Sequence, residues 1–259
     1  MTSGRRPGSR GQSRGVMAIL EADPDLGEDL SGEQLRIARG RALAEVVSFP
    51  AGPWRVDPDD FERAGNLGLL LIEGLLAREV TVGEYTCAEL LGPGDILQPW
   101  LRIGPEQSVA TEVDWEAVEP VKAAVLGREF TRRVAPWPEI PAAISRRLMQ
   151  RTHWLGFHLA VCGLRRVDDR LLLVLWHFAD RWGTVTPEGV RLDIRLTHDV
   201  LAAVTGARRP SVSTALKRMI ESGRIRSRPR SRWLLLGQAP AELQLVHEQT
   251  RRASGRRTQ

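Results

Sequence analysis

A short stretch near residue 210 carries the residue types that bind nucleic acid or another polyanion. The segment 206–223, GARRPSVSTALKRMIESG, sets two arginines, a proline and two serines ahead of a regular apolar pattern. Arginine can donate two hydrogen bonds to guanine or to a phosphate, and serine and threonine hydroxyls bind phosphate oxygens. Three interpretations compete: a solvated helix of an unrelated enzyme, a site for a phosphorylated small molecule, and a helix that docks on nucleic acid.

The apolar residues of this stretch follow the period of a helix, which predicts one buried face. The residues expected to face inward are Val212, Ala215, Leu216, Met219 and Ile220. Pro210 is expected at the first helical position, with Arg209 as the N-cap. The residues expected on the exposed side are Thr214, Lys217 and Arg218, with Ser211 and Ser213 nearer the open end.

The flanking segments predict a winged helix-turn-helix. THDVLAAVTG before the stretch is expected to form a helix capped by Thr197 and closed by Gly206. GRIRSRPRSRWLLLG after it predicts a hairpin with a basic tip, placed to touch a DNA backbone. The nucleic-acid interpretation is therefore favoured. The predicted DNA-binding residues are Thr197, Arg208, Arg209, Ser211, Ser213, Thr214, Lys217, Arg218, Arg228 and Arg230.

Charge is distributed unevenly along the chain. Residues 206–259 contain 13 lysines and arginines against 3 acidic residues, which leaves 24 against 29 in residues 1–205. Clustered cations are what a phosphate-binding surface requires. The tail RRASGRRTQ is equally well explained as a merely solvated segment.

The N-terminal half predicts an antiparallel barrel or sandwich. SGEQLRIARGRALAEVVSF, with Ser31 as N-cap, is expected to be a helix. Residues 66–100 and 108–127 alternate short apolar runs with glycine and proline, which is typical of strands. Four tryptophans in or next to these strands either pack in the core, which we favour, or line an apolar pocket. They are Trp54, Trp100, Trp115 and Trp137.

Residues 138–165 predict one long helix that pairs with a second copy of the chain. Its apolar positions step by four and three residues, as in a coiled-coil seam. The predicted dimer interface consists of Ile144, Leu148, Thr152, Leu155, Leu159 and Cys162. The alternative is a single helix lying on its own barrel.

The remaining segments complete the predicted organisation. DDRLLLVLWHFADRWG is expected to be a helix, and VRLDIRL a half-buried strand with Val190, Leu192, Ile194 and Leu196 on one face. The fold class is α+β. The predicted divisions are a disordered basic arm (1–16), a sensor β-barrel with an N-terminal helix (17–137), a dimerisation helix (138–165), a winged helix-turn-helix domain (166–240) and a basic C-terminal tail (241–259).

Several classes of protein are excluded or disfavoured. No apolar run is long enough to span a bilayer and no signal peptide is recognisable, so a cytosolic protein without membrane contact is expected. Cys87 and Cys162 lack metal-ligand spacing and are interpreted as small buried thiols, and His153 and His158 do not share a helical face. No catalytic motif is found, so an enzyme is not expected.

This order of elements resembles the Crp/Fnr family of bacterial transcription regulators, most specifically in LTHDVLAAVTGARRPSVSTALKRMIESGRI. The resemblance covers residues 60–237 and implies a cyclic-nucleotide-binding-like jelly-roll barrel, a long dimerisation helix and a winged helix-turn-helix. It implies that Arg209 reads guanine and that Ser211 contacts phosphate. Pro210 and Thr214 stand where members of the family carry a glutamate and a second arginine, so a different target sequence is expected.

The resemblance also locates a sensor pocket, with departures from the cyclic-AMP binders. Gly94 and Asp95 match the family's turn, but Gln98 and Trp100 replace its Gly-Glu, and Gln107-Ser108 its Arg-Ser. Arg102 is the one basic residue between positions 80 and 121, so a cyclic phosphate is not expected. The predicted pocket consists of Gly94, Asp95, Gln98, Trp100, Arg102, Ser108, Thr152 and Leu155. No cofactor, metal or iron-sulfur cluster is predicted.

The leading hypothesis is a homodimeric transcription regulator that reads a pseudo-palindromic operator in double-stranded DNA. Its implied partners are a second copy of the chain, RNA polymerase and an unidentified small-molecule effector. The alternative hypothesis is a ligand-independent DNA-binding protein whose barrel serves only as a dimerisation scaffold.

Overall fold

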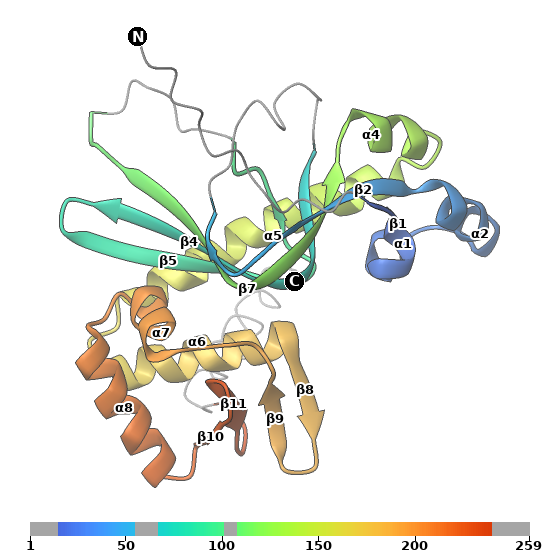
Figure 1. Ribbon diagram of the computed structural model, residues 1–259. Helices are drawn as coiled ribbons and strands as arrows, with labels where there is room; N and C mark the ends of the chain where they lie inside the picture. Colours follow the sequence, from blue (N-terminus) through green and yellow to red (C-terminus); the bar gives the residue numbers. More distant parts are fainter. Residues whose placement is uncertain (1–14, 55–66, 101–107, 240–259) are drawn as a thin grey trace, which may run out of the picture. The chain divides into compact units, whose positions relative to one another are not determined.

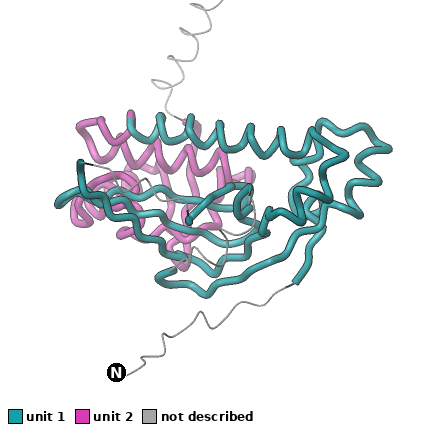
Figure 2. The backbone as a smooth tube through the Cα atoms, turned by 90° about the horizontal axis from the view of Figure 1, so that it is seen from above, with its two compact units in different colours: residues 1–159 teal, residues 160–259 magenta. Residues whose placement is uncertain are grey.

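The computed structural model describes residues 15–54, 67–100 and 108–239 (Figure 1). The chain divides into two compact units, residues 1–159 and 160–259, coloured separately in Figure 2. The boundary falls within the long helix α5 (Glu139–Cys162). Each unit is described by itself.

Unit 1 is built on a seven-stranded antiparallel sheet, as the sequence predicted. The strand order is β1-β2-β7-β4-β5, with β3 paired to β7 and β6 paired to β4. The strands are β1 (Gly15–Ala18), β2 (Leu43–Phe49), β3 (Gly52–Pro53), β4 (Gly68–Val82), β5 (Tyr85–Leu91), β6 (Ile96–Leu97) and β7 (Glu112–Leu126). The segment 108–127, expected to hold several short strands, contains the single long strand β7.

The long strand β4 pairs with different neighbours along its length, and its pairing with β7 changes register midway. Near its start β4 pairs with β6, and from Leu76 onward it pairs with β5. Between Leu71 and Leu76 the pairing with β7 shifts several times, which marks bulges that bend a strand. Gly74 lies in this region with φ of 91°, and a Cβ there would come within 2.1 Å of the Pro120 carbonyl oxygen. Only glycine therefore fits at this bend.

Alternation along the strands builds two hydrophobic cores. Successive residues of a strand point to opposite faces of the sheet. Leu69 and Leu71 accordingly belong to one core, while Leu70 between them belongs to the other. Three of the four tryptophans pack against the first core and Trp137 lies in the second, which confirms the core interpretation of these side chains.

The helices of unit 1 cover the second core. They are α1 (Ile19–Ala22), a 3-10 turn η1 (Pro24–Gly27), α2 (Gly32–Arg41), α4 (Arg128–Val134) and the first part of α5. A capping box at Ser31 begins α2, as expected. The helix predicted to continue through Phe49 ends at Arg41, and the β-branched pair Val46 and Val47 instead lies in β2, opposite β7.

The start of the chain also differs from the prediction. The segment 1–16 was expected to be a disordered arm, yet its last two residues, Gly15 and Val16, belong to β1 and pair with β2. Residues 1–14 lie outside the described part of the chain.

The described part of unit 2 that follows α5 contains three helices and a four-stranded sheet of order β10-β11-β9-β8. Its elements are α6 (Val167–Trp182), β8 (Gly183–Thr186), β9 (Gly189–Leu192), α7 (His198–Thr205), α8 (Arg209–Glu221), β10 (Ile225–Arg228) and β11 (Arg232–Leu235). The apolar face of α6 is buried through Leu171, Leu175 and Phe178. The strand predicted over 190–196 ends at Leu192, although Leu196 beyond it is buried as expected.

Candidate nucleic-acid interface

Two short helices, α7 and α8, meet at a tight turn. The Thr197 hydroxyl caps α7 by accepting from the Val200 N–H at 3.2 Å. Gly206 ends α7 with left-handed φ of 57°, and the next N–H, of Ala207, donates to the Ala202 carbonyl at 3.0 Å. The sequence-predicted helix-turn-helix is therefore present, with both of its predicted caps on α7.

Helix α8 buries one side and exposes a polar side. Four of the five residues expected to face inward are buried, but Ile220 is 42% exposed. The N-cap is Arg208, so Arg209 and Pro210 occupy the first two helical positions, one residue earlier than predicted. Proline is still tolerated there because first-turn N–H groups have no partner within the helix. The exposed residues of α8 include Arg209, Pro210, Ser211, Thr214, Lys217 and Arg218.

Each cation of α8 has an acidic neighbour. The Arg209 Nε lies 2.8 Å from Asp199 on α7, and both side chains are largely exposed. Arg218 makes two hydrogen bonds to Asp168 on α6, at 3.0 and 2.7 Å, and the Asp168 side chain is only 16% exposed. Lys217 lies 3.8 Å from Glu221 on its own helix. Arg218, predicted to point freely outward, is therefore tied to the start of α6.

The hydroxyl groups of α8 have different surroundings. The Thr214 hydroxyl donates to the Pro210 carbonyl at 3.0 Å, which leaves its oxygen lone pairs facing solvent. The Ser213 hydroxyl is half-buried and lies 2.8 Å from Nδ1 of His198, whose ring stacks on Trp233. Ser211 is exposed at the open end of the helix. Ser211 and Thr214 are thus accessible, whereas Ser213 is held by a neighbouring element.

The predicted basic wing is present as the β10–β11 hairpin. Its turn places Arg230 and Ser231 at φ of 61° and 55°. The Ser231 carbonyl accepts from the Leu196 N–H at 2.9 Å, which ties the tip to the residue before the α7 cap. Arg228 and Arg230 are exposed. The exposed arginines of the wing therefore lie close to the N-terminal turn of α7.

In unit 1, helix α5 turns a different face to its own sheet than the sequence predicted. Ile144 is 1% exposed and lies in the core with α4 and the sheet, and Leu148 packs against the same core. These two residues are therefore not part of a free seam. The exposed side of α5 contains Met149, next to the predicted Leu148, and the predicted Leu159, which are 74% and 76% exposed.

The buried side of α5 carries arginines that bind the sheet and the N-terminal segment. Arg147 donates to both carboxylate oxygens of Asp23 and, at 2.9 Å, to the Gly94 carbonyl. Arg151 makes two hydrogen bonds of 2.7 Å to Glu89 on β5. Burial lowers the pKa of Arg151, but the hydrogen bonds and charge of Glu89 outweigh burial, so the net shift is upward.

The predicted pocket residues do not form one polar site. Asp95 is buried and accepts from the Gly92 N–H at 2.8 Å, and the Gln98 amide donates to the Leu67 carbonyl at 3.1 Å. Asp95 thus stabilises its own turn, and Gln98 joins the end of β6 to the residue before β4. Trp100 packs against the core, Ser108 and Thr152 are exposed, and Leu155 is half-buried. Arg102 lies outside the described residues.

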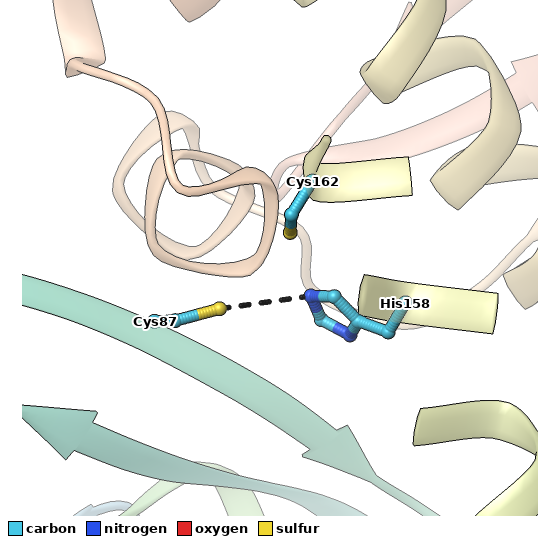
Figure 3. Close-up of side chains that lie close together, drawn as sticks. All are labelled: Cys87, His158 and Cys162. Atoms are coloured by element: carbon cyan, nitrogen blue, oxygen red, sulfur yellow. Dashed lines mark hydrogen bonds between the residues drawn. The ribbon is translucent and has the colours of Figure 1, made fainter. Parts of the chain in front are cut away.

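Cys87 on β5 and His158 on α5 contact each other, which the sequence did not suggest. The Cys87 Sγ lies 3.8 Å from the His158 Nε2 (Figure 3). Both side chains are half-buried, and Cys162, one helical turn after His158, is half-buried too. The sequence predicted small buried thiols, but both cysteines are only half-buried. Polar contacts of α5 within the described part of unit 1 thus include those of Arg147, Arg151 and His158.

Sequence reasoning missed the acidic partners of the interface. Asp199 lies in the first turn of α7, where an acidic residue is a common helix-start feature. Asp168 is 50 residues before Arg218, and no local pattern links them. His198 was also missed, although its place directly after the cap Thr197 made it a neighbour of the turn.

Comparison with known proteins identifies a DNA-binding domain in the C-terminal part of the chain. Residues 169–243 match the model of the Crp-like helix-turn-helix domain. The CRP-like cAMP-activated global transcriptional regulator of Mycobacterium tuberculosis is 27% identical over 190 residues, which cover 66% of this chain and 81% of that protein. Among the described residues, none of the helices combines the length and the hydrophobicity that crossing a bilayer requires.

Solved structures share the fold. A CooA mutant from Carboxydothermus hydrogenoformans is similar with a TM-score of 0.56 and 19% identity, covering 73% of this chain and 82% of that one. A CRP/FNR family transcriptional regulator from Thermus thermophilus gives 0.52 and 23%, covering 74% and 93%. A cyclic nucleotide-binding domain containing protein from Listeria monocytogenes EGD-e gives 0.56 and 14%, covering 73% and 87%.

Proposed function

Because residues 169–243 match the Crp-like helix-turn-helix domain and a CRP-like regulator is 27% identical over 190 residues, we propose that the chain belongs to the Crp/Fnr family and binds a pseudo-palindromic operator in double-stranded DNA as a homodimer. In this proposal the protein acts as a transcription regulator and not as an enzyme. The observation that carries the proposal is the exposed face of α8, which offers Arg209, Ser211 and Thr214 beyond a fully packed opposite side.

Helix α8 is the proposed recognition helix. Arg209 lies in its first turn, and its bond to Asp199 is solvent-exposed, so exchange for a guanine costs little. A guanidinium can bond both O6 and N7 of guanine in the major groove. Ser211 and Thr214 are proposed to bind phosphate or base edges, and Arg228 and Arg230 of the wing to bind the backbone.

The exposed stripe of α5 is the proposed dimer interface. Met149, Thr152, Gly156 and Leu159 are all exposed and follow a spacing of three, four and three residues. This is the spacing of a two-helix seam. A second copy of the chain would bury two large apolar side chains that otherwise face water, and small residues between them allow close approach. Two recognition helices in a dimer would read half-sites one helical turn apart.

The effector of the barrel is proposed not to be cyclic AMP, in contrast to the Mycobacterium tuberculosis relative described as cAMP-activated. A cyclic phosphate needs a cation or several N–H donors. The cations on the buried face of α5, Arg147 and Arg151, already pair with Asp23 and Glu89. We propose that the barrel binds an effector of another class. We also propose that the protein acts in the cytoplasm and contacts RNA polymerase there.

Selection of bound sites from a random duplex library tests the proposal. The wild-type protein is expected to recover a two-fold symmetric motif, and Arg209→Ala is expected to lose about 1–3 kcal/mol of discrimination at one position of each half-site. Arg36→Ala is the matched control, because Arg36 is equally exposed and ion-paired to Glu33 but lies on α2 of unit 1.

The outcomes are distinct. A symmetric motif that the control variant keeps and Arg209→Ala relaxes supports the proposed reading helix. An unchanged motif in Arg209→Ala contradicts the role of Arg209. Recovery of an asymmetric motif contradicts the homodimer, and recovery of no motif with or without cell extract contradicts sequence-specific binding.

A further inference from the structure

The pair formed by Arg218 and Asp168 differs from the other ion pairs of α8. Nε and Nη2 of Arg218 each donate to a different carboxylate oxygen of Asp168, at 3.0 and 2.7 Å. Asp168 lies in the first turn of α6, where the helix dipole stabilises a carboxylate, and its side chain is largely buried. A bidentate pair with one partner shielded from water is stronger than an exposed single contact.

The Arg209 pair gives the opposite picture on the same helix. Arg209 contacts Asp199 through one nitrogen, and both side chains are more than 60% exposed. Solvent competes with this contact, so a DNA phosphate or base can replace it at little cost. Arg218 cannot exchange Asp168 for a DNA group in this way, because Asp168 would then remain as a shielded, unpaired carboxylate.

Arg218 also closes one side of a groove of about 540 Å³ within unit 2. The groove is lined by Arg166, Val167, Asp168, Pro210, Ser211, Thr214 and Arg218. The charged groups that face Arg218 there are Asp168 from α6 and Arg166 from the residue before it. The groove thus runs between the start of α6 and the N-terminal half of α8, where the orientation of α8 is set.

We propose that Asp168 withholds Arg218 from DNA and makes it a positioning residue, which fixes α8 on α6 without contacting phosphate. This rests on the proposed function as a DNA-binding protein. In this arrangement Asp168 lowers sequence-blind affinity, since it removes one cation per subunit from the surface that a polyanion attracts. The same bond keeps the exposed side of α8 in one orientation.

The salt dependence of DNA binding tests the inference, because each cation that neutralises a phosphate adds about 0.9 to the slope of log K against log salt. Binding of the full-length protein to a duplex of random sequence would be followed by fluorescence anisotropy at several salt concentrations. Asp168→Asn is expected to free Arg218 and to steepen the slope by about 0.9 per subunit. For a dimer this adds a roughly tenfold loss of affinity between 50 and 200 mM salt.

Four further variants separate positioning from a general change of charge. Asp169→Asn removes an exposed acid from the same turn of α6 and is expected to leave the slope unchanged. Asp168→Glu keeps the charge and is expected to keep the wild-type slope. Arg218→Ala is expected to leave the slope unchanged but to broaden the base preference, and the double variant Asp168→Asn with Arg218→Ala returns to the wild-type slope.

The opposite results overturn the inference. A slope that becomes shallower by about 0.9 per subunit in Arg218→Ala would mean that Arg218 reaches a phosphate in the wild-type protein. Equal slopes for Asp168→Asn and Asp169→Asn would mean that Asp168 withholds nothing. Absence of any duplex binding by the wild-type protein would overturn the proposed function, and the inference with it. The Arg218→Ala result decides the matter even where Asp168→Asn does not fold.

Discussion

Replacing Glu89 by alanine is expected to destabilise unit 1 strongly, because it leaves two arginines without their counter-charge. Arg151 loses two hydrogen bonds of 2.7 Å, and Arg78 loses a carboxylate 3.5 Å away. The Glu89 and Arg151 side chains are 13% and 18% exposed. Breaking a buried ion pair on one side costs about 3–5 kcal/mol, and the residual exposure here favours about 3 kcal/mol.

Calorimetry or circular dichroism would measure the effect as a shift of the melting temperature. For a unit of this size a loss of about 3 kcal/mol lowers the melting temperature by roughly 6–12 °C. Glu33→Ala is the matched control, because its pair with Arg36 on α2 is exposed and such pairs contribute little. The control is expected to melt close to the wild-type temperature.

A second variant separates lost charge from lost shape. Glu89→Leu combined with Arg151→Met replaces the ion pair by apolar side chains of similar volume, which is often neutral. The double variant is expected to melt above Glu89→Ala. A fall of less than about 3 °C in Glu89→Ala, which corresponds to roughly 1 kcal/mol, would refute the reasoning. So would a double variant less stable than the single one.

Three further results are expected. Burial and neighbouring acidic side chains of β7 raise the pKa of Glu79, so its charged form weakens the fold at neutral pH, and Glu79→Gln should raise the melting temperature at about pH 7. That gain should vanish as the pH falls through the raised pKa and Glu79 itself becomes protonated. Gly74→Ala should destabilise unit 1 by at least about 2 kcal/mol in denaturant unfolding, since its Cβ would meet the Pro120 carbonyl. Leu159→Glu should shift a dimer to monomer in sedimentation, because it charges the exposed stripe of α5.

Each of these has a matched control. Glu84→Gln removes an exposed acid near the β4–β5 turn and should show no pH-dependent gain. Gly83→Ala also has positive φ, but open space surrounds it, so it should cost less than Gly74→Ala. Val185→Glu charges an equally exposed position of β8 and should leave the dimer intact. Equal effects in a variant and its control would contradict the corresponding explanation.

The features of unit 2 that the sequence predicted correctly depend on local chemistry. The helix α7 could be delimited because Thr197 and Gly206 act through their own neighbours. The wing could be recognised because a Pro-Arg turn separates two short strands. The boundary of α8 was off by one residue, since Arg208 and Arg209 are chemically identical and only the backbone angles distinguish them.

The features that were missed depend on long-range packing. Residues 43–49 have a composition that suits a helix or a strand, and the partner strand β7 decides for the strand. The heptad pattern of α5 contains two overlapping apolar stripes, and the stripe that contains Ile144 is buried in the core of unit 1. The pocket was predicted from residues 94–108 together with Thr152 and Leu155 of α5, but the prediction left out the α5 cations Arg147 and Arg151.

The polar contacts of α5 within unit 1 come from residues spaced by whole helical turns along one side of the helix. Arg147 and Arg151 are one turn apart, and His158 follows after two more turns on the same side. Turning the helix by one residue, about 100°, would break all of these bonds together and leave two arginines shielded and unpaired. A stimulus that moves α5 would therefore have to break these contacts together, and it must bind the moved arrangement more tightly by enough to offset their loss.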